Sequence, residues 1–309
     1  MEKILVTGGA GYVGSVLVPC LLAEGYQVRV LDNLMYGQGA VLLAHFSCPH
    51  FEFLRGDVRE EETVYRAVKD VDAIVHLAAI VGYPACKKNP ELARQVNVEG
   101  TRMLLRHRSP EQFLVFASTI SNYGQIREEH CTEETPLNPL TVYGETKTRA
   151  EELCRKAGNT VCFRFATAFG LSPRLRLDLL INDFVYSALK RKNLIVYEKN
   201  YRRTFIHVRD MARAIMFALH QRQQMRDEVY NVGSENYTKE EIALMLRERL
   251  EFFLHFAEVG RDEDQRDYFA SYEKIRRLGF ETTITVEEGI EELIRGLEGI
   301  EVQNPYANV

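Results

Sequence analysis

The sequence lacks several features, each of which would have indicated a different class of protein. Its longest apolar runs, such as Ala73–Ala79, are far too short to cross a membrane. Its 44 acidic and 39 basic residues give a net charge of −5 at pH 7, so the chain has no excess of positive charge that would attract nucleic acid. It contains no internal repeat, low-complexity segment or Pro/Ser-rich linker. These absences favour an ordinary globular protein without a membrane or nucleic-acid partner.

The cysteines and histidines form no pattern that would hold a metal ion. The six cysteines are scattered without CxxC spacing, and neither an HxxxH pair nor a mixed Cys/His cluster occurs. The sequence therefore predicts no metal site, and reduced, mostly buried thiols in a cytoplasmic protein. His76 and His207 stand at the ends of apolar runs, where we expect satisfied core imidazoles. The strand-like Lys3–Thr7 begins almost at the first residue, so we expect no signal peptide.

Short β-rich runs alternate with longer helical patterns in the first half of the chain. Strands are expected over 4–6, 27–31, 51–54, 73–76, 113–117 and 161–165, and helices over 13–23, 61–68, 90–106 and 143–156. Several of the strands are apolar throughout, as expected when helices cover both faces of a parallel sheet. The alternation predicts an α/β protein with a doubly wound parallel (Rossmann) sheet.

The pattern loosens after Arg164, with no linker to separate a second domain. Helices are expected over 178–191, 208–220, 239–249 and 286–296, and a strand over 229–232. We expect residues 1–165 to form a dinucleotide-binding domain, to which 203–232 return. Residues 166–202 and 233–309 would form a smaller, interleaved substrate-binding cap. The cap would lie on the carboxyl edge of the sheet, where open α/β folds bind ligands.

The strongest local signal is a glycine fingerprint between the first strand and the first helix. Gly8 would permit a tight turn, Gly11 would let the backbone approach a pyrophosphate, and Gly14 would let the helix pack closely. The free N–H groups and partial positive charge of the helix N-terminus would then hold the anion. The fingerprint therefore predicts a dinucleotide cofactor.

Two aspartates follow the next two strands and bear on the choice of cofactor. Asp32 ends the second strand at the position where a carboxylate accepts hydrogen bonds from the adenosine ribose. A carboxylate there also repels a 2′-phosphate, which favours NAD over NADP. The alternative is that Asp32 is only a turn residue. Asp57 follows the third strand and would either contact the adenine amino group or cap the next helix.

A tyrosine and a lysine begin the helix expected over 143–156. Tyr143 and Lys147 are four residues apart and so share one helix face. A tyrosine titrates near ~10, but a nearby ammonium and a positive nicotinamide ring favour phenolate. Tyr143 could then take a proton from a substrate hydroxyl as hydride leaves, or return one. Ser118 and Thr119, at a strand end, would either bond the same oxygen or satisfy backbone groups.

With these motifs the sequence resembles the extended short-chain dehydrogenase/reductase family, especially its nucleotide-sugar epimerases and reductases of the UDP-galactose 4-epimerase type. The resemblance runs in order through Gly8–Gly14, Leu31–Leu34, Gly56–Val58, His76–Ala79, Asn97–Thr101, Ser118–Thr119, the Tyr143/Lys147 pair, Arg203–Val208 and Leu278–Phe280. It implies an NAD-dependent enzyme acting on a UDP-, GDP-, CDP- or dTDP-linked sugar. It also implies a homodimer formed through the helices at 91–106 and 143–156.

These arguments and the resemblance together give a set of expected site residues. The expected catalytic residues are Thr119, Tyr143 and Lys147. Expected cofactor contacts are Gly8, Gly11, Tyr12, Val13, Asp32, Asn33, Asp57, Val58, Leu77, Ala78, Ala79, Asn97, Ser118, Tyr143 and Lys147. Expected substrate contacts are Val81, Tyr83, Thr119, Tyr143, Thr167, Arg174, Arg176, Asn182, Arg203 and Arg261. The resemblance makes Arg203 and Arg261 clamps for the substrate diphosphate.

Two positions depart from the patterns of the family. Its 4,6-dehydratases have an Asp-Glu pair after the catalytic threonine, whereas this chain has Ile120 and Ser121, so dehydration by that route is not expected. Many members have an asparagine where this chain has Thr167. Arg174 or Arg176 would compensate for it at the diphosphate, unless their segment is only a solvated loop.

The leading hypothesis is an NAD-dependent epimerase that transiently oxidises a sugar carbinol at C4. The nearest alternative is an NAD(P)H-dependent 4-keto-sugar-nucleotide reductase, which would use the same catalytic residues. A non-catalytic, dinucleotide-sensing regulator of the same fold is a third possibility, but it need not keep Tyr143 and Lys147 together. The net charge disfavours an RNA-binding derivative of the fold.

Overall fold

A seven-stranded parallel sheet forms the centre of the computed structural model, which describes residues 1–124, 130–258 and 267–300. The strands run in the order β11-β7-β5-β4-β1-β2-β3. Their bounds are β1 (Lys3–Thr7), β2 (Gln27–Asp32), β3 (Phe51–Arg55), β4 (Ala73–His76), β5 (Phe113–Thr119), β7 (Thr160–Phe165) and β11 (Val229–Val232). The strand order reverses between β1 and β4. The carboxyl ends of these two strands are therefore the expected ligand crevice.

Helices cover both faces of this sheet, which confirms the predicted doubly wound fold. One face packs against α1 (Gly14–Ala23) and α8 (Val208–His220). The other packs against α2 (Glu61–Val68), α5 (Gly100–His107) and α6 (Val142–Ala157). Alternate residues of β1 point to opposite faces, with Ile4 and Val6 in one core and Leu5 in the other. This two-sided burial explains why several of the central strands are apolar throughout.

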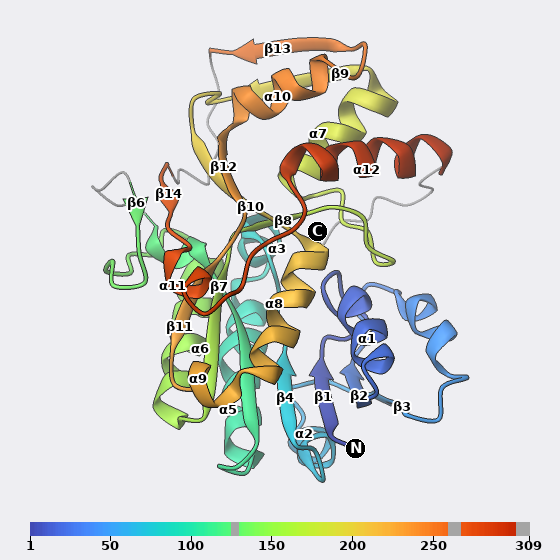
Figure 1. Cartoon of the computed structure of the whole chain (residues 1–309), viewed down its shortest axis with the longest axis vertical. Coiled ribbons are helices and arrows are strands. Elements are labelled where there is room, and N and C mark those ends of the chain that lie inside the picture. Colours follow the sequence, from blue (N-terminus) through green and yellow to red (C-terminus); the bar gives the residue numbers. More distant parts are fainter. Residues whose placement is uncertain (125–129, 259–266, 301–309) are drawn as a thin grey trace.

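A smaller unit lies beyond the carboxyl ends of the central strands (Figure 1). One of its sheets contains β8 (Thr167–Phe169), β10 (Arg202–His207) and β12 (Glu235–Thr238), and the other contains β9 (Asn193–Tyr197) and β13 (Phe253–Ala257). Its helices are α7 (Leu180–Tyr186), α10 (Lys239–Arg247) and α12 (Val286–Gly299). Apolar side chains from these elements form a separate core around Phe169, Phe205 and Ile290. We call this unit the cap.

The chain crosses between the two units several times. Residues 203–207, the start of the 203–232 segment that we expected to return to the dinucleotide-binding domain, belong to β10 and pair with β8 and β12 in the cap. The return begins with α8 and β11. A later segment also returns, because Tyr268, Tyr272 and Phe280 belong to the core under α1 and α8. It contains β14 (Phe269–Ala270), which pairs with β6 (His130–Cys131), and α11 (Glu273–Arg276).

The remaining elements include two departures from regular helices. The helix expected over 90–106 consists of α4 (Pro90–Arg94), a π-helical turn η2 (Gln95–Glu99) and α5; the helix expected over 178–191 consists of α7 and a π-helical turn η4 (Ser187–Arg191). The others are η1 (Gly39–His45), α3 (Tyr83–Lys88), η3 (Ile120–Tyr123) and α9 (Arg222–Met225). Such π-turns often occur at functional sites. Here η2 carries Asn97, whose amide contacts the loop after β4.

The structure also bears on what we expected of membrane-spanning helices, metal ligands and thiols. Within 1–124, 130–258 and 267–300, no helix is both long and apolar enough to span a membrane. Over the same residues, no group of three potential ligands could hold a metal ion. All six cysteines are free, and four of them are buried: Cys86, Cys131, Cys154 and Cys162.

Candidate functional site

A cavity of about 450 Å³ lies between the carboxyl edge of the sheet and the cap. Most of the expected site residues line it: Gly8, Gly11, Tyr12, Val13, Asp32, Asn33, Val58, Leu77, Ala78, Ala79, Val81, Tyr83, Ser118, Thr119, Tyr143, Lys147, Thr167, Arg174, Arg176 and Arg203. Three expected residues, Asp57, Asn97 and Asn182, are described by the structure but lie behind the lining. Arg261 lies outside the described residues.

The glycine turn after β1 has the shape that a dinucleotide needs. Gly8 has a φ of +71°, and a Cβ on it would lie 2.8 Å from the backbone nitrogen of Ala78. A Cβ on Gly14 would lie 2.5 Å from the carbonyl oxygen of Gly8, so α1 can approach the turn only without a side chain there. Val13 begins α1 without a side-chain cap. The N-terminus of the helix can therefore offer its N–H groups to an anion.

Asp32 lines the cavity and also holds the glycine turn. Its Oδ2 accepts a hydrogen bond from the backbone N–H of Ala10 at 3.0 Å, and its Oδ1 accepts one from Leu34 at 2.8 Å. Burial raises the pKa of this carboxyl, and those two N–H groups oppose the rise. Oδ1 also accepts a longer hydrogen bond from the Gln38 amide at 3.4 Å, so the lone pair left for a further donor is on Oδ2. The turn role that we left as an alternative is thus present, and it is compatible with a ribose contact.

Asp57 is occupied by neighbours rather than directed into the cavity. Its two carboxylate oxygens accept hydrogen bonds from the Arg59 guanidinium at 2.9 and 2.8 Å, and Oδ2 accepts another from Asn33 at 2.9 Å. The Arg59 contact is the main reason why the pKa of Asp57 falls to about 2. Asp57 does not cap α2, whose N-cap position is Glu60. The adjacent Val58, not Asp57, reaches the cavity.

Asn97 and Asn182 support the lining from behind. The Asn97 amide makes two hydrogen bonds to the backbone of Ile80, at 2.8 and 3.0 Å, and a third to Thr146, the residue before Lys147. Asn182 accepts from the backbone N–H of Gly170 and donates to the carbonyl of Arg176. These amides therefore fix the loops that carry lining residues. Only a residue type that both donates and accepts can hold a backbone N–H and a C=O in this way.

Helix α6 brings the predicted acid/base pair to the cavity. Thr141 caps the helix by accepting a hydrogen bond from Gly144, which places Tyr143 in the first turn and Lys147 in the second. The Lys147 ammonium is buried 4.2 Å from the centre of the Phe116 ring. Burial lowers the pKa of Lys147 to about 8. A fixed positive charge one turn from the phenol favours its ionised form.

The two hydroxyls at the end of β5 have different partners. Thr119 lines the cavity and caps η3 by accepting a hydrogen bond from the backbone N–H of Ser121 at 3.1 Å. Ser118 donates to Glu151 on α6 at 2.5 Å and accepts from Asn122 at 3.0 Å. Thr119 thus satisfies a strand-end backbone group, as one of the two was expected to do. Ser118 is tied to α6.

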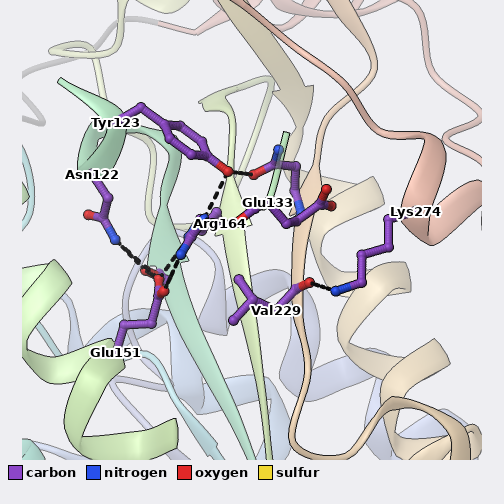
Figure 2. A network of polar contacts seen from close by, with 9 residues as sticks. Asn122, Tyr123, Glu133, Glu151, Arg164, Val229 and Lys274 are labelled. Carbon is purple, nitrogen blue, oxygen red and sulfur yellow. Dashed lines mark hydrogen bonds and ion pairs between the residues drawn. The ribbon is translucent and has the colours of Figure 1, made fainter. Parts of the chain in front are cut away.

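A buried polar network behind these residues was missed by the sequence analysis (Figure 2). Glu151 and Arg164 form an ion pair at 2.6 Å in which both side chains are almost completely buried. Arg164 also donates to the Tyr123 hydroxyl at 2.9 Å, and that hydroxyl donates to Asn231 at 2.7 Å. The network joins α6, β7, η3 and β11. Glu151 lies one turn beyond Lys147 on the same face of α6. This i+4 spacing was the one feature of the sequence that could have indicated that Glu151 is buried near the site.

Three arginines bring positive charge to the cavity from two directions. Arg203 on β10 is buried and its guanidinium donates to the carbonyl of Arg202 at 3.0 Å. Arg176 makes a two-point contact with Asp178, at 3.1 and 2.6 Å. Arg174 lies 5.1 Å from the ring centre of Tyr36, which follows β2. The segment that carries Arg174 and Arg176 is therefore not a solvated loop.

The two histidines that follow apolar runs, His76 and His207, lie in the interior. His76 contacts the hydroxyls of Thr7 at 2.7 Å and Thr101 at 3.0 Å, and burial and then Lys147 lower its pKa to about 3. His76 is therefore the satisfied core imidazole that we expected. His207 begins α8 by accepting a hydrogen bond from Arg209, but its Nε2 makes no hydrogen bond within the described part of the chain. The nearest carboxylate oxygen, on Glu292, is 3.5 Å away.

Comparison with known proteins identifies what this arrangement resembles. A model of the family "NAD dependent epimerase/dehydratase" matches residues 4–233. UDP-glucose 4-epimerase 2 of Arabidopsis thaliana is 29% identical over 99% of this chain and 96% of its own. The Bacillus cereus UDP-glucuronic acid 4-epimerase, solved with UDP-glucuronic acid and NAD, is 25% identical, with a TM-score of 0.86 over 96% of this chain and 99% of that one.

A third relative catalyses a different reaction. The dTDP-glucose 4,6-dehydratase of Streptomyces venezuelae, solved with NAD, is 28% identical to this chain. It superposes with a TM-score of 0.85 over 95% of this chain and 96% of its own. The similarity to solved structures therefore spans more than one reaction, and the residues around the cavity have to distinguish between them.

Proposed function

Because this chain belongs to the NAD-dependent epimerase/dehydratase family, we propose that it epimerises a nucleotide sugar by transient oxidation of one sugar carbinol, at C4. Membership makes the protein an NAD-dependent enzyme of the nucleotide-sugar class. It confirms the family, the Rossmann fold and the cofactor that the motifs predicted. The finer reaction rests on the site.

The observation that carries the proposal is that Thr119, Tyr143 and Lys147 line one cavity with the glycine turn. Tyr143 would remove the proton of the sugar hydroxyl, and Lys147 would stabilise the phenolate that does so. Thr119 would hydrogen-bond the same oxygen. Bound NAD would supply a hydride acceptor and then a hydride donor. If the sugar turns before the hydride returns, the configuration inverts without net oxidation.

Among the residues that the structure describes, the lining offers no acid of the kind that dehydration would require. Ile120 is buried in the core, and the Ser121 hydroxyl accepts a hydrogen bond from Thr119. The carboxylates among the described lining residues are Asp32 and Asp178. The first holds the glycine turn and the second is paired with Arg176. Neither is free to protonate a leaving hydroxyl, so the site favours epimerisation over loss of water.

The substrate's diphosphate would lie on the cap side. Arg203 reaches the cavity from β10, and Thr167 reaches it from the neighbouring strand β8. A guanidinium offers paired donors that match phosphate oxygens. Arg203 therefore suits the diphosphate of a nucleotide sugar, at the opposite side of the cavity from the glycine turn.

Incubation with candidate sugars tests the proposed reaction. Purified protein would be given UDP-, GDP-, CDP- and dTDP-linked hexoses and their 4-keto forms, and the products followed by mass spectrometry and NMR. We expect a new sugar nucleotide of unchanged mass, formed without added NADH. A gain of two hydrogens with oxidation of NADH would establish the reductase instead, and loss of water would establish a dehydratase. The Tyr143→Phe variant is the control for contaminating activity.

A further inference from the structure

The segment from Leu171 to Leu179 leaves the cap and lies against the first helix of the dinucleotide-binding unit. The Ser172 hydroxyl donates to the carbonyl oxygen of Tyr12 at 2.7 Å and lies 2.9 Å from the Ser15 hydroxyl. The Tyr12 hydroxyl in turn donates to the carbonyl of Gly170 at 2.7 Å. These contacts attach the segment to the turn where a dinucleotide pyrophosphate binds. We call residues 171–179 the strap.

Arg174 is the strap residue whose guanidinium stands over the ring of Tyr36, in the segment that follows β2. Its side chain is buried, its backbone N–H donates to Ser15, and its guanidinium stands 5.1 Å from the ring centre of Tyr36. Tyr36 is linked through Gln38 to Asp32, because Gln38 accepts from the Tyr36 N–H at 3.0 Å and donates to Asp32 at 3.4 Å. Arg174 therefore belongs to the end of the cavity that carries the expected ribose carboxylate.

We propose that Arg174 and Tyr36 form a clasp over the adenosine diphosphate half of NAD, and that Arg174 is not a contact to the substrate's diphosphate. The N-terminus of α1 would bind the pyrophosphate from one side and the Arg174 guanidinium from the other. The Tyr36 ring would close the adenosine end. The cofactor could then leave only after the strap separates from Tyr12 and Ser15, so it is retained between turnovers.

Geometry separates this clasp from the clamp assigned to Arg203. Arg203 is carried by the cap sheet, and its guanidinium lies over Tyr201, a cap residue. The backbone N–H of Arg174 instead donates to Ser15, a residue of the helix that begins at the glycine turn. The inference depends on NAD being the cofactor of the family, not on which sugar is bound or whether the reaction is epimerisation.

Binding measurements on single variants test the clasp. Arg174→Met keeps the aliphatic stem and removes the charge, and Arg209→Met, at an exposed arginine that pairs with Glu292, is the matched control. Calorimetric titration of protein freed of nucleotide would use ADP-ribose, NAD and UDP. We expect Arg174→Met to weaken the binding of ADP-ribose and NAD at least roughly ten-fold, because one charge-assisted contact is lost. The binding of UDP should weaken less than about two-fold. Unchanged ADP-ribose binding, or a larger loss for UDP, would overturn the proposal.

Retention is measured separately by the release of NADH. Ser172→Ala removes the hydroxyl that joins the strap to Tyr12 without touching the charge of Arg174. We expect it to speed the release of NADH, followed by fluorescence after mixing with excess NAD, at least several-fold. Tyr36→Leu removes the aromatic half of the clasp and should also speed the release of NADH. It takes the place of Arg174→Met if that variant does not fold. A release rate equal to that of the parent in both variants would contradict the clasp, and neither experiment depends on the sugar reaction.

Discussion

Glu151 and Arg164 are joined by an ion pair inside the protein, with Arg164 Nη2 2.6 Å from Glu151 Oε1 and side chains only 2% and 3% exposed. Glu151 is on α6, which also carries Tyr143 and Lys147, and Arg164 is on β7. The same carboxylate accepts from Ser118, next to Thr119 on β5. The pair therefore fixes the helix that bears the proposed acid/base, Tyr143, against the strand that bears its proposed hydroxyl partner, Thr119.

Breaking this pair on one side should cost much stability. Glu151→Gln would leave the Arg164 charge buried without its counterion, and removal of one partner of such a pair typically costs about 3–5 kcal/mol. Urea unfolding of the protein without cofactor measures the loss. The double variant Glu151→Gln/Arg164→Met should recover most of it, because no buried charge is left. A double variant as unstable as the sum of both single variants would show that the charges do not act as a pair.

Sequence reasoning predicted the parts of the fold that depend on local pattern. Strands buried on both faces are apolar runs, and β4 and β7 were placed within one residue at each end. The return to the dinucleotide-binding domain was expected to begin at 203, but residues 203–207 pair with β8 and β12 in the cap, and these pairings are not visible in a local sequence pattern. The π-turn at η2 was also missed. It carries Asn97, whose contact with the backbone of Ile80 is not visible in helical periodicity.

Tyr143→Phe should lose most turnover while keeping the affinity for NAD within a few-fold of the parent. The substitution removes the phenolic oxygen that would exchange a proton with the sugar, but it retains the ring and leaves Lys147 in place. Initial rates with whichever sugar nucleotide the proposed incubations convert, together with a separate NAD titration, measure both effects. Turnover close to that of the parent would remove Tyr143 from the mechanism.

The buried ammonium of Lys147 should impose a pH dependence on stability. Its pKa falls from 10.5 in the unfolded chain to about 8 in the fold, because burial disfavours the charge. Between these values the unfolded chain binds more protons than the folded one, so this group's contribution to stability rises with pH. Below pH 8 the buried charge costs up to about 3 kcal/mol.

Lys147→Met should therefore be more stable than the parent at pH 7 when both lack cofactor. The difference should shrink as the pH rises from 8 towards 10.5. Denaturant unfolding of both proteins at several pH values is the measurement. A stability difference that stays constant through this window would mean that Lys147 does not titrate there.

Asp32→Ala should weaken NAD binding and narrow the preference for NAD over NADP. The carboxylate would both accept from the ribose and repel a 2′-phosphate. Because Asp32 also holds Ala10 and Leu34, some stability should be lost as well. The decisive quantity is therefore the ratio of the two affinities, which a general loosening of the turn would not change. An unaltered ratio would assign Asp32 to the turn alone.

The candidate site was predictable where a motif is contiguous and not where it is assembled by the fold. The glycine turn, Asp32 and the Tyr143/Lys147 pair are short motifs, and all of them line the cavity. Charged residues such as Glu151 and Arg164 are usually solvated, so their burial becomes visible only when α6 and β7 are packed together. The strap was noticed for its basic residues. Its position, however, depends on the contact between Ser15 and Ser172, which are 157 residues apart in the sequence.

The substrate clamp is the prediction that most directly tests the nucleotide-sugar assignment. A diphosphate entering the cavity needs donors to offset the loss of its hydration. Arg203 is buried at the cavity wall and Thr167 offers only a hydroxyl. A hydrogen bond to a charged group contributes about 1.5–3 kcal/mol, so Arg203→Ala should weaken UDP binding roughly ten- to a hundred-fold.

The same substitution should leave NAD binding nearly unchanged, because we expect the cofactor pyrophosphate at the glycine turn. Titrating Arg203→Ala and Arg174→Met with UDP and with ADP-ribose gives four affinities that must form a crossed pattern. Arg203→Ala should lose affinity for UDP, and Arg174→Met should lose affinity for ADP-ribose. If Arg203→Ala binds UDP as the parent does while unfolding at lower urea, its guanidinium is structural, held by Arg202 and Tyr201. The diphosphate would then need another partner, and the strongest residue-level reason for a nucleotide-linked substrate would be lost.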